Sequence, residues 1–103
     1  MDNLGKHLAH SHYKHILETA KIAANLGKQE KVKVYIVGGV VRDIILGRKT
    51  HDIDLMVEGN GISFAKKLAN IIGVKKIVPF EKFGTALIPY KLFQIEVASS
   101  RSE

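Results

Sequence analysis

The feature that most constrains the fold is an apolar segment that runs into a pair of glycines and is followed by an Asp-x-Asp. The segment Val34–Val37 leads directly into Gly38 and Gly39, and Asp52 and Asp54 come after a short basic stretch. Glycine lacks a Cβ, so its backbone can turn sharply and bring its N–H groups close to a ligand. Side chains alternate along a strand, so Asp52 and Asp54 must point to the same face. The sequence therefore predicts two strands connected through a glycine turn, with acidic side chains on one face.

The paired carboxylates predict a metal site. Two negative charges this close repel each other unless a cation lies between them. Carboxylate oxygens suit Mg²⁺, which keeps several waters and completes its shell with substrate phosphates. Two such ions about 3.5–4 Å apart can activate an attacking hydroxyl and stabilise a leaving oxygen. We therefore expect Asp52 and Asp54 to hold two Mg²⁺ ions in a site for a nucleoside triphosphate, as nucleotidyl transfer requires.

The glycine turn predicts the phosphate-binding side of the same site. A short helix expected over residues 40–46 would present the positive end of its dipole to a phosphate. Arg42 would lie in its first turn, where a planar guanidinium can bridge phosphate oxygens. Asp43 is expected to support the turn or the arginine rather than to bind metal. Gly38, Gly39 and Arg42 are thus the expected triphosphate-binding residues.

Hydrophobic periodicity predicts an α/β (α+β) fold. Apolar residues recur at helical spacing in some segments and alternate with polar residues in others. We expect Gly27 and Gly73 to end helices, and Pro89 to mark an edge or a bulge. The expected elements are a helix over about residues 8–27, a strand over 32–36, a short helix over 40–46, a strand over 52–57, a helix over 62–72 and strands over 74–80, 85–90 and 92–98.

These elements are expected to form one compact domain. Residues 1–31 would be an amphipathic helix with a basic linker, and residues 32–103 a mixed, mostly antiparallel sheet of about five strands with helices on one side. On the last strand, Glu96 shares a face with Gln94. If that strand lies beside the one bearing the Asp-x-Asp, Glu96 becomes a third carboxylate of the site.

Composition sets limits on the class of protein. A chain of 103 residues can bury a single core. It has no cysteine, which excludes disulfides and thiolate metal sites and is compatible with a cytoplasmic location. No apolar run is long enough to span a membrane, so no membrane partner is expected. The formal charge of +6 favours polyanionic partners such as RNA.

The histidines near the amino terminus allow two interpretations. They include helical neighbours that could bind a transition metal, but an exposed polar face is the simpler interpretation because no acidic or cysteine partner is near. The amino-terminal residues concerned are His7, His10, His12 and His15.

The His-Asp dipeptide at residues 51–52 is a separate motif. It also occurs in all-helical phosphohydrolases, whereas here it begins a strand.

From about residue 32 to the last residue, the chain resembles the head domain of class II tRNA nucleotidyltransferases, the CCA-adding enzymes, and of bacterial poly(A) polymerases. These enzymes belong to the DNA polymerase beta superfamily. The glycine turn combined with the Asp-x-Asp is a far more specific signal than either motif alone. The motifs that carry the resemblance are Gly38-Gly39-Val40-Val41-Arg42-Asp43, Leu46-Gly47, Asp52-Ile53-Asp54-Leu55, Phe83-Gly84-Thr85 and the segment from Glu96 to Glu103.

The resemblance implies an enzyme and its residues. The carboxylates that match Asp52 and Asp54 bind magnesium in that family. The residues that match Gly39 and Arg42 contact the triphosphate, and the arginine that matches Arg101 helps to bind the nucleotide. The implied reaction is attack by the 3′-hydroxyl of tRNA, or of another RNA, on the α-phosphate of CTP or ATP, with Arg101 neutralising developing charge.

The chain also departs from the family pattern. Family members are several times longer, and a helical neck that reads the incoming base and further tRNA-binding domains follow the head. The chain is therefore expected to be a head with weak activity unless another chain supplies the rest. The alternatives are a non-catalytic nucleotide- or RNA-binding module and a subunit that completes its site by self-association. Glu96 matches a third carboxylate of the wider superfamily, and the choice among CCA, CC, A and poly(A) addition stays open.

Overall fold

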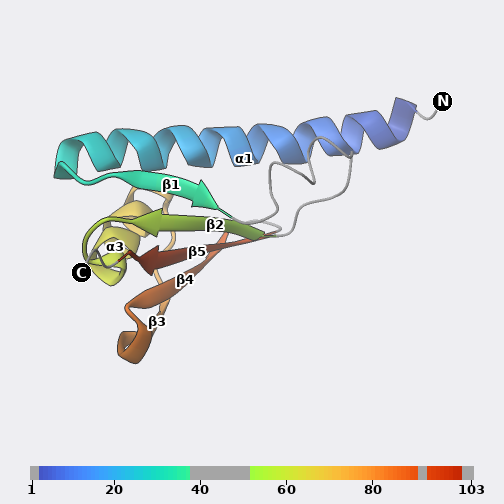
Figure 1. Ribbon diagram of the computed structural model, residues 1–103. Coiled ribbons are helices and arrows are strands. Elements are labelled where there is room, and N and C mark those ends of the chain that lie inside the picture. Colours follow the sequence, from blue (N-terminus) through green and yellow to red (C-terminus); the bar gives the residue numbers. More distant parts are fainter. Residues whose placement is uncertain (1–2, 38–51, 91–92, 101–103) are drawn as a thin grey trace.

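In the part of the chain that the structure describes, two helices pack on a five-stranded sheet (Figure 1). The computed structural model describes residues 3–37, 52–90 and 93–100. The expected helix over 40–46 and the predicted site residues Gly38, Gly39, Arg42 and Arg101 lie outside this part. The described elements are α1 (Asn3–Glu30), β1 (Val34–Val37), β2 (Asp52–Val57), α3 (Gly61–Ile72), β3 (Val78–Phe80), a 3₁₀ turn (Glu81–Phe83), β4 (Thr85–Tyr90) and β5 (Phe93–Ser99).

The strand order is β1-β2-β5-β4-β3. β1 pairs with β2, β4 with β5 and β3 with β4 in antiparallel fashion, whereas β2 and β5 run parallel. Parallel neighbours require a crossover connection, and here α3, β3 and β4 supply it. The predicted mixed, mostly antiparallel sheet is therefore confirmed.

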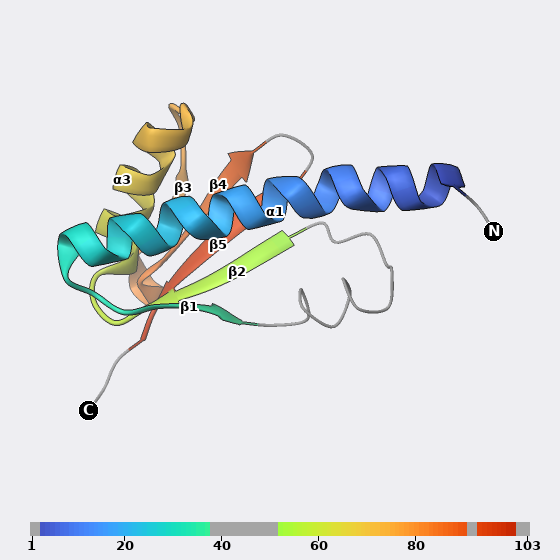
Figure 2. The ribbon, with the colours of Figure 1, turned by 90° about the horizontal axis from the view of Figure 1, so that it is seen from above.

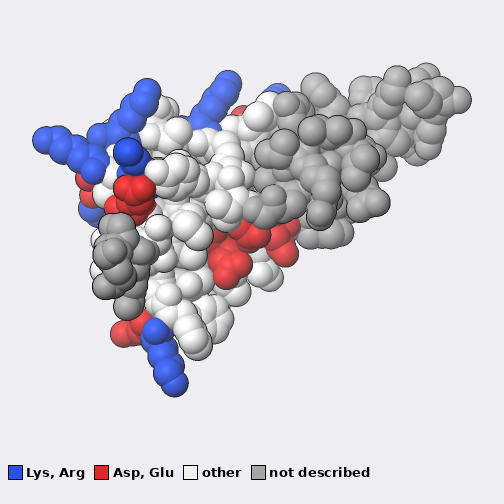
Figure 3. All heavy atoms as spheres, viewed as in Figure 1, with Lys and Arg blue, Asp and Glu red and all other residues white. Residues whose placement is uncertain are grey.

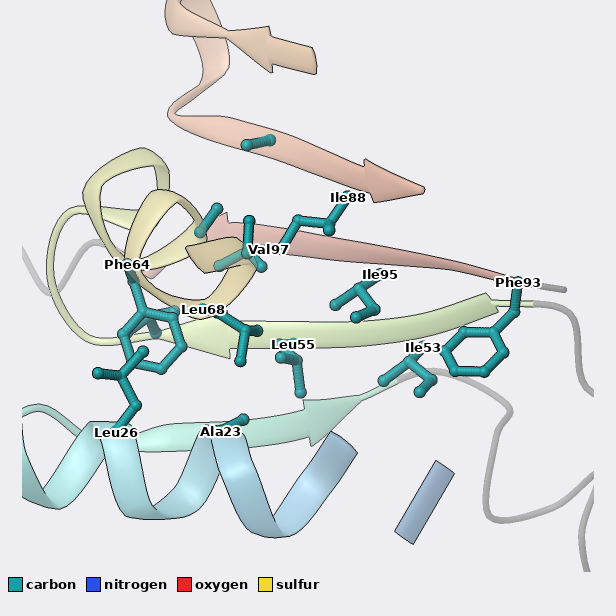
Figure 4. Close-up of a cluster of buried hydrophobic side chains, with 14 of the residues drawn as sticks. Ala23, Leu26, Ile53, Leu55, Phe64, Leu68, Ile88, Phe93, Ile95 and Val97 are labelled. Atoms are coloured by element: carbon teal, nitrogen blue, oxygen red, sulfur yellow. The ribbon is translucent and has the colours of Figure 1, made fainter. Parts of the chain in front are cut away.

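The core that the described residues form lies on one side of the sheet. Ile53, Leu55 and Val57 of β2 are buried, in the alternation that the sequence predicted. Both helices cover this face, as the view from above shows (Figure 2). The opposite face of the sheet carries no helix from the described part of the chain. The labelled side chains from α1, α3 and the strands that meet in this core are Ala23, Leu26, Ile53, Leu55, Phe64, Leu68, Ile88, Phe93, Ile95 and Val97 (Figure 4).

The prediction that Gly27 ends the first helix is wrong, because α1 continues to Glu30. Lys31 then takes a left-handed conformation with φ 59°, and the N–H of Val32 donates to the Gly27 carbonyl at 2.9 Å. This is the hydrogen bond of a Schellman ending, with lysine in the place that glycine usually takes. Gly27 is required for another reason, since a Cβ there would lie 2.7 Å from a methyl of Val34. No helix in the described part of the chain has the length and apolar character to cross a membrane.

The second described helix, α3, has the boundaries that its local signals predict. Asn60 caps its start, because the Asn60 side chain accepts the N–H of Ser63 at 3.0 Å. Gly73 ends it in the left-handed conformation, with φ 81°. The N–H of Val74 donates to the Ala69 carbonyl at 2.8 Å, which completes the helix end.

This helix ending explains why the strand predicted over residues 74–80 is too long. Val74 belongs to the end of α3, and the paired strand β3 covers only Val78–Phe80. β3 pairs with the first half of β4, as far as Leu87. Pro89 lies beyond that pairing, where β4 is the edge of the sheet, as predicted. The register of β4 with β5 is continuous, so there is no bulge at Pro89.

Candidate active site

The carboxylates of Asp52, Asp54 and Glu96 lie on the face of the sheet that α1 and α3 do not cover. Asp52 and Asp54 alternate with the buried Ile53 and Leu55, so they point away from the core. β5 lies beside β2, and the register pairs Asp54 with Glu96. The predicted placement of the three acids on one face is therefore confirmed. Acidic side chains form a patch in the middle of this side of the molecule (Figure 3).

The closeness of the acids changes their electrostatics. The pKa of Glu96 is raised above its ordinary value by partial burial, by the negative charge of Asp54, by a hydrogen bond with Asp54 and by the charge of Asp52. Each of these effects disfavours a third negative charge on this face. A bound cation would remove the repulsion, so the donor set fits a hard divalent metal ion.

The acidic side chains do not enclose a complete metal-binding site by themselves. Within the described ranges, no three His, Cys, Asp or Glu side chains converge closely enough to enclose an ion. This is compatible with Mg²⁺, which takes one or two protein carboxylates and fills the rest of its shell with water and substrate phosphates.

β1 ends beside the acid pair, directly before Gly38 and Gly39 in the sequence. β1 is antiparallel to β2, and its last residue, Val37, pairs with Asp54. Gly38 is the next residue along the chain, and the chain enters β2 at Asp52. Paired residues on antiparallel strands are about 5 Å apart at their Cα atoms. The 38–51 segment, which carries Gly39 and Arg42 outside the described residues, is therefore attached at both ends next to the carboxylates.

The end of β5 lies away from the acid pair. Because β5 runs parallel to β2, its last residue, Ser99, pairs with Val57 at the opposite end of β2 from Asp52. The N–H of Ser100 donates to the Val57 carbonyl at 2.7 Å, which ties the chain down there. Arg101 is the next residue and lies outside the described part. Sequence reasoning did not foresee that its attachment point is at this end of the sheet.

Sequence reasoning also missed a junction that holds the end of β5. The Ser99 hydroxyl accepts the N–H of Gly61 at 2.7 Å and donates to the carbonyl of Gly84 at 2.7 Å. A Cβ at Gly61 would lie 2.8 Å from that carbonyl, so this close approach requires glycine. Gly84 has φ 64°, which also favours glycine. The only sequence signal for the junction was the pair of turn glycines.

The concavities near this junction are separate from the acids. A hollow of about 610 Å³ lies at the start of α3, and Ser99 and Gly84 line it. The carboxylates lie instead on the sheet face opposite α1 and α3, next to the attachment points of the 38–51 segment. We therefore place the candidate site at the carboxylates and not in the hollow.

Residues 34–103 match the family model of the poly(A) polymerase head domain, which covers both described Asp positions, Glu96 and the glycine turn. The chain belongs to the poly(A) polymerase head domain family. The expected resemblance is thus confirmed, and so is the α/β fold that it implied.

Named relatives of this head domain are tRNA nucleotidyltransferases. The A-adding tRNA nucleotidyltransferase of Aquifex aeolicus is 49% identical over 72 residues, which are 70% of this chain and 9% of that protein. A Thermotoga maritima CCA-adding enzyme complexed with tRNA has a TM-score of 0.76 and 38% identity, covering 84% of this chain and 21% of that one. A tRNA nucleotidyltransferase complexed with a primer tRNA and an incoming ATP analogue has a TM-score of 0.69 and 44% identity, covering 77% and 23%. The head domain described here spans less than a quarter of each.

Proposed function

We propose that this head domain is the catalytic and triphosphate-binding part of a template-independent RNA nucleotidyltransferase, which adds CMP or AMP from CTP or ATP to the 3′ end of tRNA in the cytoplasm. The observation that carries the proposal is the set of carboxylates on two neighbouring strands, next to the end of β1 from which the chain continues into Gly38 and Gly39. The relatives support it, since one is named as A-adding and one as CCA-adding.

The positions of the three acids on neighbouring strands support their proposed roles. Asp52 and Asp54 would hold two Mg²⁺ ions, and Glu96 would add a third carboxylate beside Asp54. When bound, such ions lower the pKa of the attacking hydroxyl and stabilise the leaving oxygen. The acids themselves fix where the reacting groups meet, because their strands belong to a rigid sheet whose other face is the core.

The proposed reaction is a single in-line displacement. The RNA 3′-oxygen forms a bond to the α-phosphorus of the nucleoside triphosphate, the bond from that phosphorus to the bridging oxygen breaks, and pyrophosphate leaves. The hydroxyl proton passes to solvent. Gly38, Gly39 and Arg42 would hold the triphosphate, and Arg101 would contribute positive charge to nucleotide binding.

Parts beyond this head domain are proposed to select the base and hold the tRNA. The head domain spans 9% of the Aquifex relative and 21% of the Thermotoga enzyme, so most of each relative lies outside the match. We expect the isolated head to bind Mg²⁺·NTP and to transfer nucleotides weakly. A neck region supplied in trans, or a second copy of the chain, would complete the site.

Calorimetric titration of Mg²⁺·ATP tests the metal and triphosphate site. Asp52→Asn and Asp54→Asn should each abolish measurable binding, because each removes a carboxylate from the pair. Glu81→Gln is the matched control, since Glu81 is an exposed acid in the 3₁₀ turn before β4 and away from the patch. If both Asp variants bind Mg²⁺·ATP as well as the parent does, the proposed site is wrong.

Incorporation of labelled CTP or ATP into tRNA that lacks its 3′ end tests catalysis, with a neck fragment added in trans. Binding of Mg²⁺·ATP without incorporation under these conditions would identify a nucleotide-binding module instead. Sedimentation at several concentrations tests the third possibility, because a strict monomer that is active excludes a site completed by self-association.

A further inference from the structure

One aromatic side chain on the open face has no role in the site as described so far. Tyr35 belongs to β1, an edge strand, and its side chain is 43% exposed. The register pairs Tyr35 with Met56, while Val37 on the same strand pairs with Asp54. Paired residues share a face, so the Tyr35 ring lies on the same side of the sheet as the carboxylates.

Tyr35 is held at its outer end. Its hydroxyl donates to Glu58 Oε2 at 2.9 Å. The N–H of Glu58 in turn donates to the carbonyl of Lys33 at 2.9 Å, which continues the β1·β2 ladder by one position. The hydrogen bond to Glu58 restricts the motion of the ring before any ligand binds. An aromatic surface that is already ordered loses less conformational entropy on binding.

The ring is close enough to the carboxylates to serve the same ligand. Tyr35 is one strand away from Met56, and Met56 is two residues along β2 from Asp54. Strand geometry puts these steps at about 4.8 Å and about 7 Å, so the backbones at Tyr35 and Asp54 are about 8 Å apart. A nucleotide whose sugar or phosphate lies at the carboxylates can therefore place its base over Tyr35.

The positive charge of Lys33 favours a nucleotide phosphate over an apolar protein segment at this position. Lys33 precedes Tyr35 by two residues, so it extends to the same face, and it is exposed. A phosphate group can meet the lysine while the base covers the ring, whereas an apolar protein segment would have to bury or displace the lysine charge. Unpaired bases stack on aromatic side chains whatever their identity, because each base has a π face.

We propose that Tyr35 is a stacking platform for an unpaired nucleobase, with Lys33 meeting the adjacent phosphate. This inference rests on the proposed function, because it assumes that a nucleotide occupies the carboxylate site. The base belongs either to the 3′ end of the acceptor RNA or to the incoming nucleoside triphosphate. Both sources present the same chemistry to the ring.

A single tryptophan reports on stacking directly. The sequence has no tryptophan, so Tyr35→Trp introduces the only one. Its emission should be quenched by a short single-stranded RNA, by Mg²⁺·ATP, or by both, and comparison of the two titrations identifies the source of the base. Ile71→Trp is the matched control, because Ile71 is 51% exposed on α3, on the other side of the sheet, and its emission should not respond.

Truncation of the ring measures its contribution. Tyr35→Ala should weaken binding of the quenching ligand by about 5- to 100-fold, the range for loss of one base–aromatic stack. Tyr35→Phe keeps the ring and removes the bond to Glu58, so it should stay within a few-fold of the parent. Thermal unfolding of each variant checks that the fold is intact.

The inference is overturned if the tryptophan at position 35 is not quenched by either ligand, or if the folded Tyr35→Ala variant binds both as the parent does. That outcome would favour a protein segment as the partner of this face. The titration of Asp54→Asn with Mg²⁺·ATP separates this failure from failure of the proposed function. If Asp54→Asn loses binding and the Tyr35 variants show no effect, only the stacking platform is refuted. If the Tyr35 variants show the effect and Asp54→Asn keeps its binding, the metal site is refuted.

Discussion

Asp54 and Glu96 are register partners on neighbouring parallel strands, and both face the side of the sheet that the helices leave uncovered. The chain thus brings together two acids that are separated in sequence by a helix and two strands. In the protein without ligands, this pairing is unfavourable, because like charges on adjacent strands repel. The structure tolerates at this position a repulsion that a bound cation would relieve.

The pH dependence of stability should reveal this repulsion. The pKa of Glu96 is raised in the folded protein, first by partial burial and then by Asp54, so the folded state binds more protons than the unfolded state over that range. The free energy of unfolding should therefore fall as the pH rises from the ordinary Glu value through the raised pKa, and then level off. Glu96→Gln should reduce this fall and raise the melting temperature at pH 7 without Mg²⁺.

Thermal unfolding followed by circular dichroism from pH 4 to pH 7 measures the effect, with Glu81→Gln as the exposed control. Added Mg²⁺ should stabilise the parent more than Glu96→Gln, since the variant lacks one of the charges that the ion neutralises. An identical pH profile for the parent and Glu96→Gln would contradict the assignment.

Ser99→Ala should destabilise the protein by about 1–3 kcal/mol, because it leaves the buried Gly61 N–H without its acceptor and the Gly84 carbonyl without one of its donors. Urea unfolding gives the change in the free energy of unfolding. Ser63→Ala is the control, because that side chain is exposed at the start of α3 and its backbone N–H, not its hydroxyl, makes the capping bond. If Ser99→Ala changes the free energy of unfolding as little as the control Ser63→Ala does, the junction contributes nothing to stability.

Gly27→Ala should be destabilising although alanine is the better helix former. Helix propensity alone favours alanine by about 1 kcal/mol. The new Cβ would lie 2.7 Å from a methyl of Val34 and 3.0 Å from the Val32 carbonyl, and such overpacking costs about 1–3 kcal/mol. In a Val34→Ala background the first contact is gone, so Gly27→Ala should cost less there. A double-mutant cycle measured by urea unfolding gives the coupling, and a coupling of zero would mean that the close approach is not formed.

Adjacent residues on β2 should differ sharply in their response to truncation. Leu55→Ala should cost about 2–5 kcal/mol, because Leu55 is 1% exposed and lies in the core between the sheet and the helices. Met56→Ala should cost much less, since Met56 is only half-buried on the open face. Similar losses for both would mean that the open face is covered by protein in solution.

The elements with strong local signals could be predicted from the sequence. The alternation around Asp52 and Asp54 predicted the strand β2 and its acidic face, and both are observed. The helix α3 was predicted because apolar residues recur at helical spacing, and its end was predicted because Gly73 gives a stop signal that depends only on neighbouring residues. Local chemistry decides these features, so no knowledge of distant contacts was needed.

The errors occurred where a distant contact decides the local structure. Gly27 was expected to end α1, but it is glycine because β1 returns close to the helix at Val34. From the sequence, Glu96 could be placed beside Asp54 only on the condition that their strands are neighbours. Alternation shows which face of a strand a side chain lies on, and not which strand lies next to it. The role of Ser99 depends on the same parallel pairing, so no local pattern indicated it.

The parallel pairing of β2 with β5 has a consequence for biosynthesis. α3, β3 and β4 are all translated between these two strands, and bringing distant segments together has a loop-closure cost that local hairpins do not have. On the ribosome, a nascent chain can form α1 and the β1·β2 ladder before β5 has emerged, but it then lacks Glu96 beside Asp54. The face that carries the acids is therefore completed only after β5 has been translated, so a nascent chain that lacks β5 cannot display Glu96 beside Asp54.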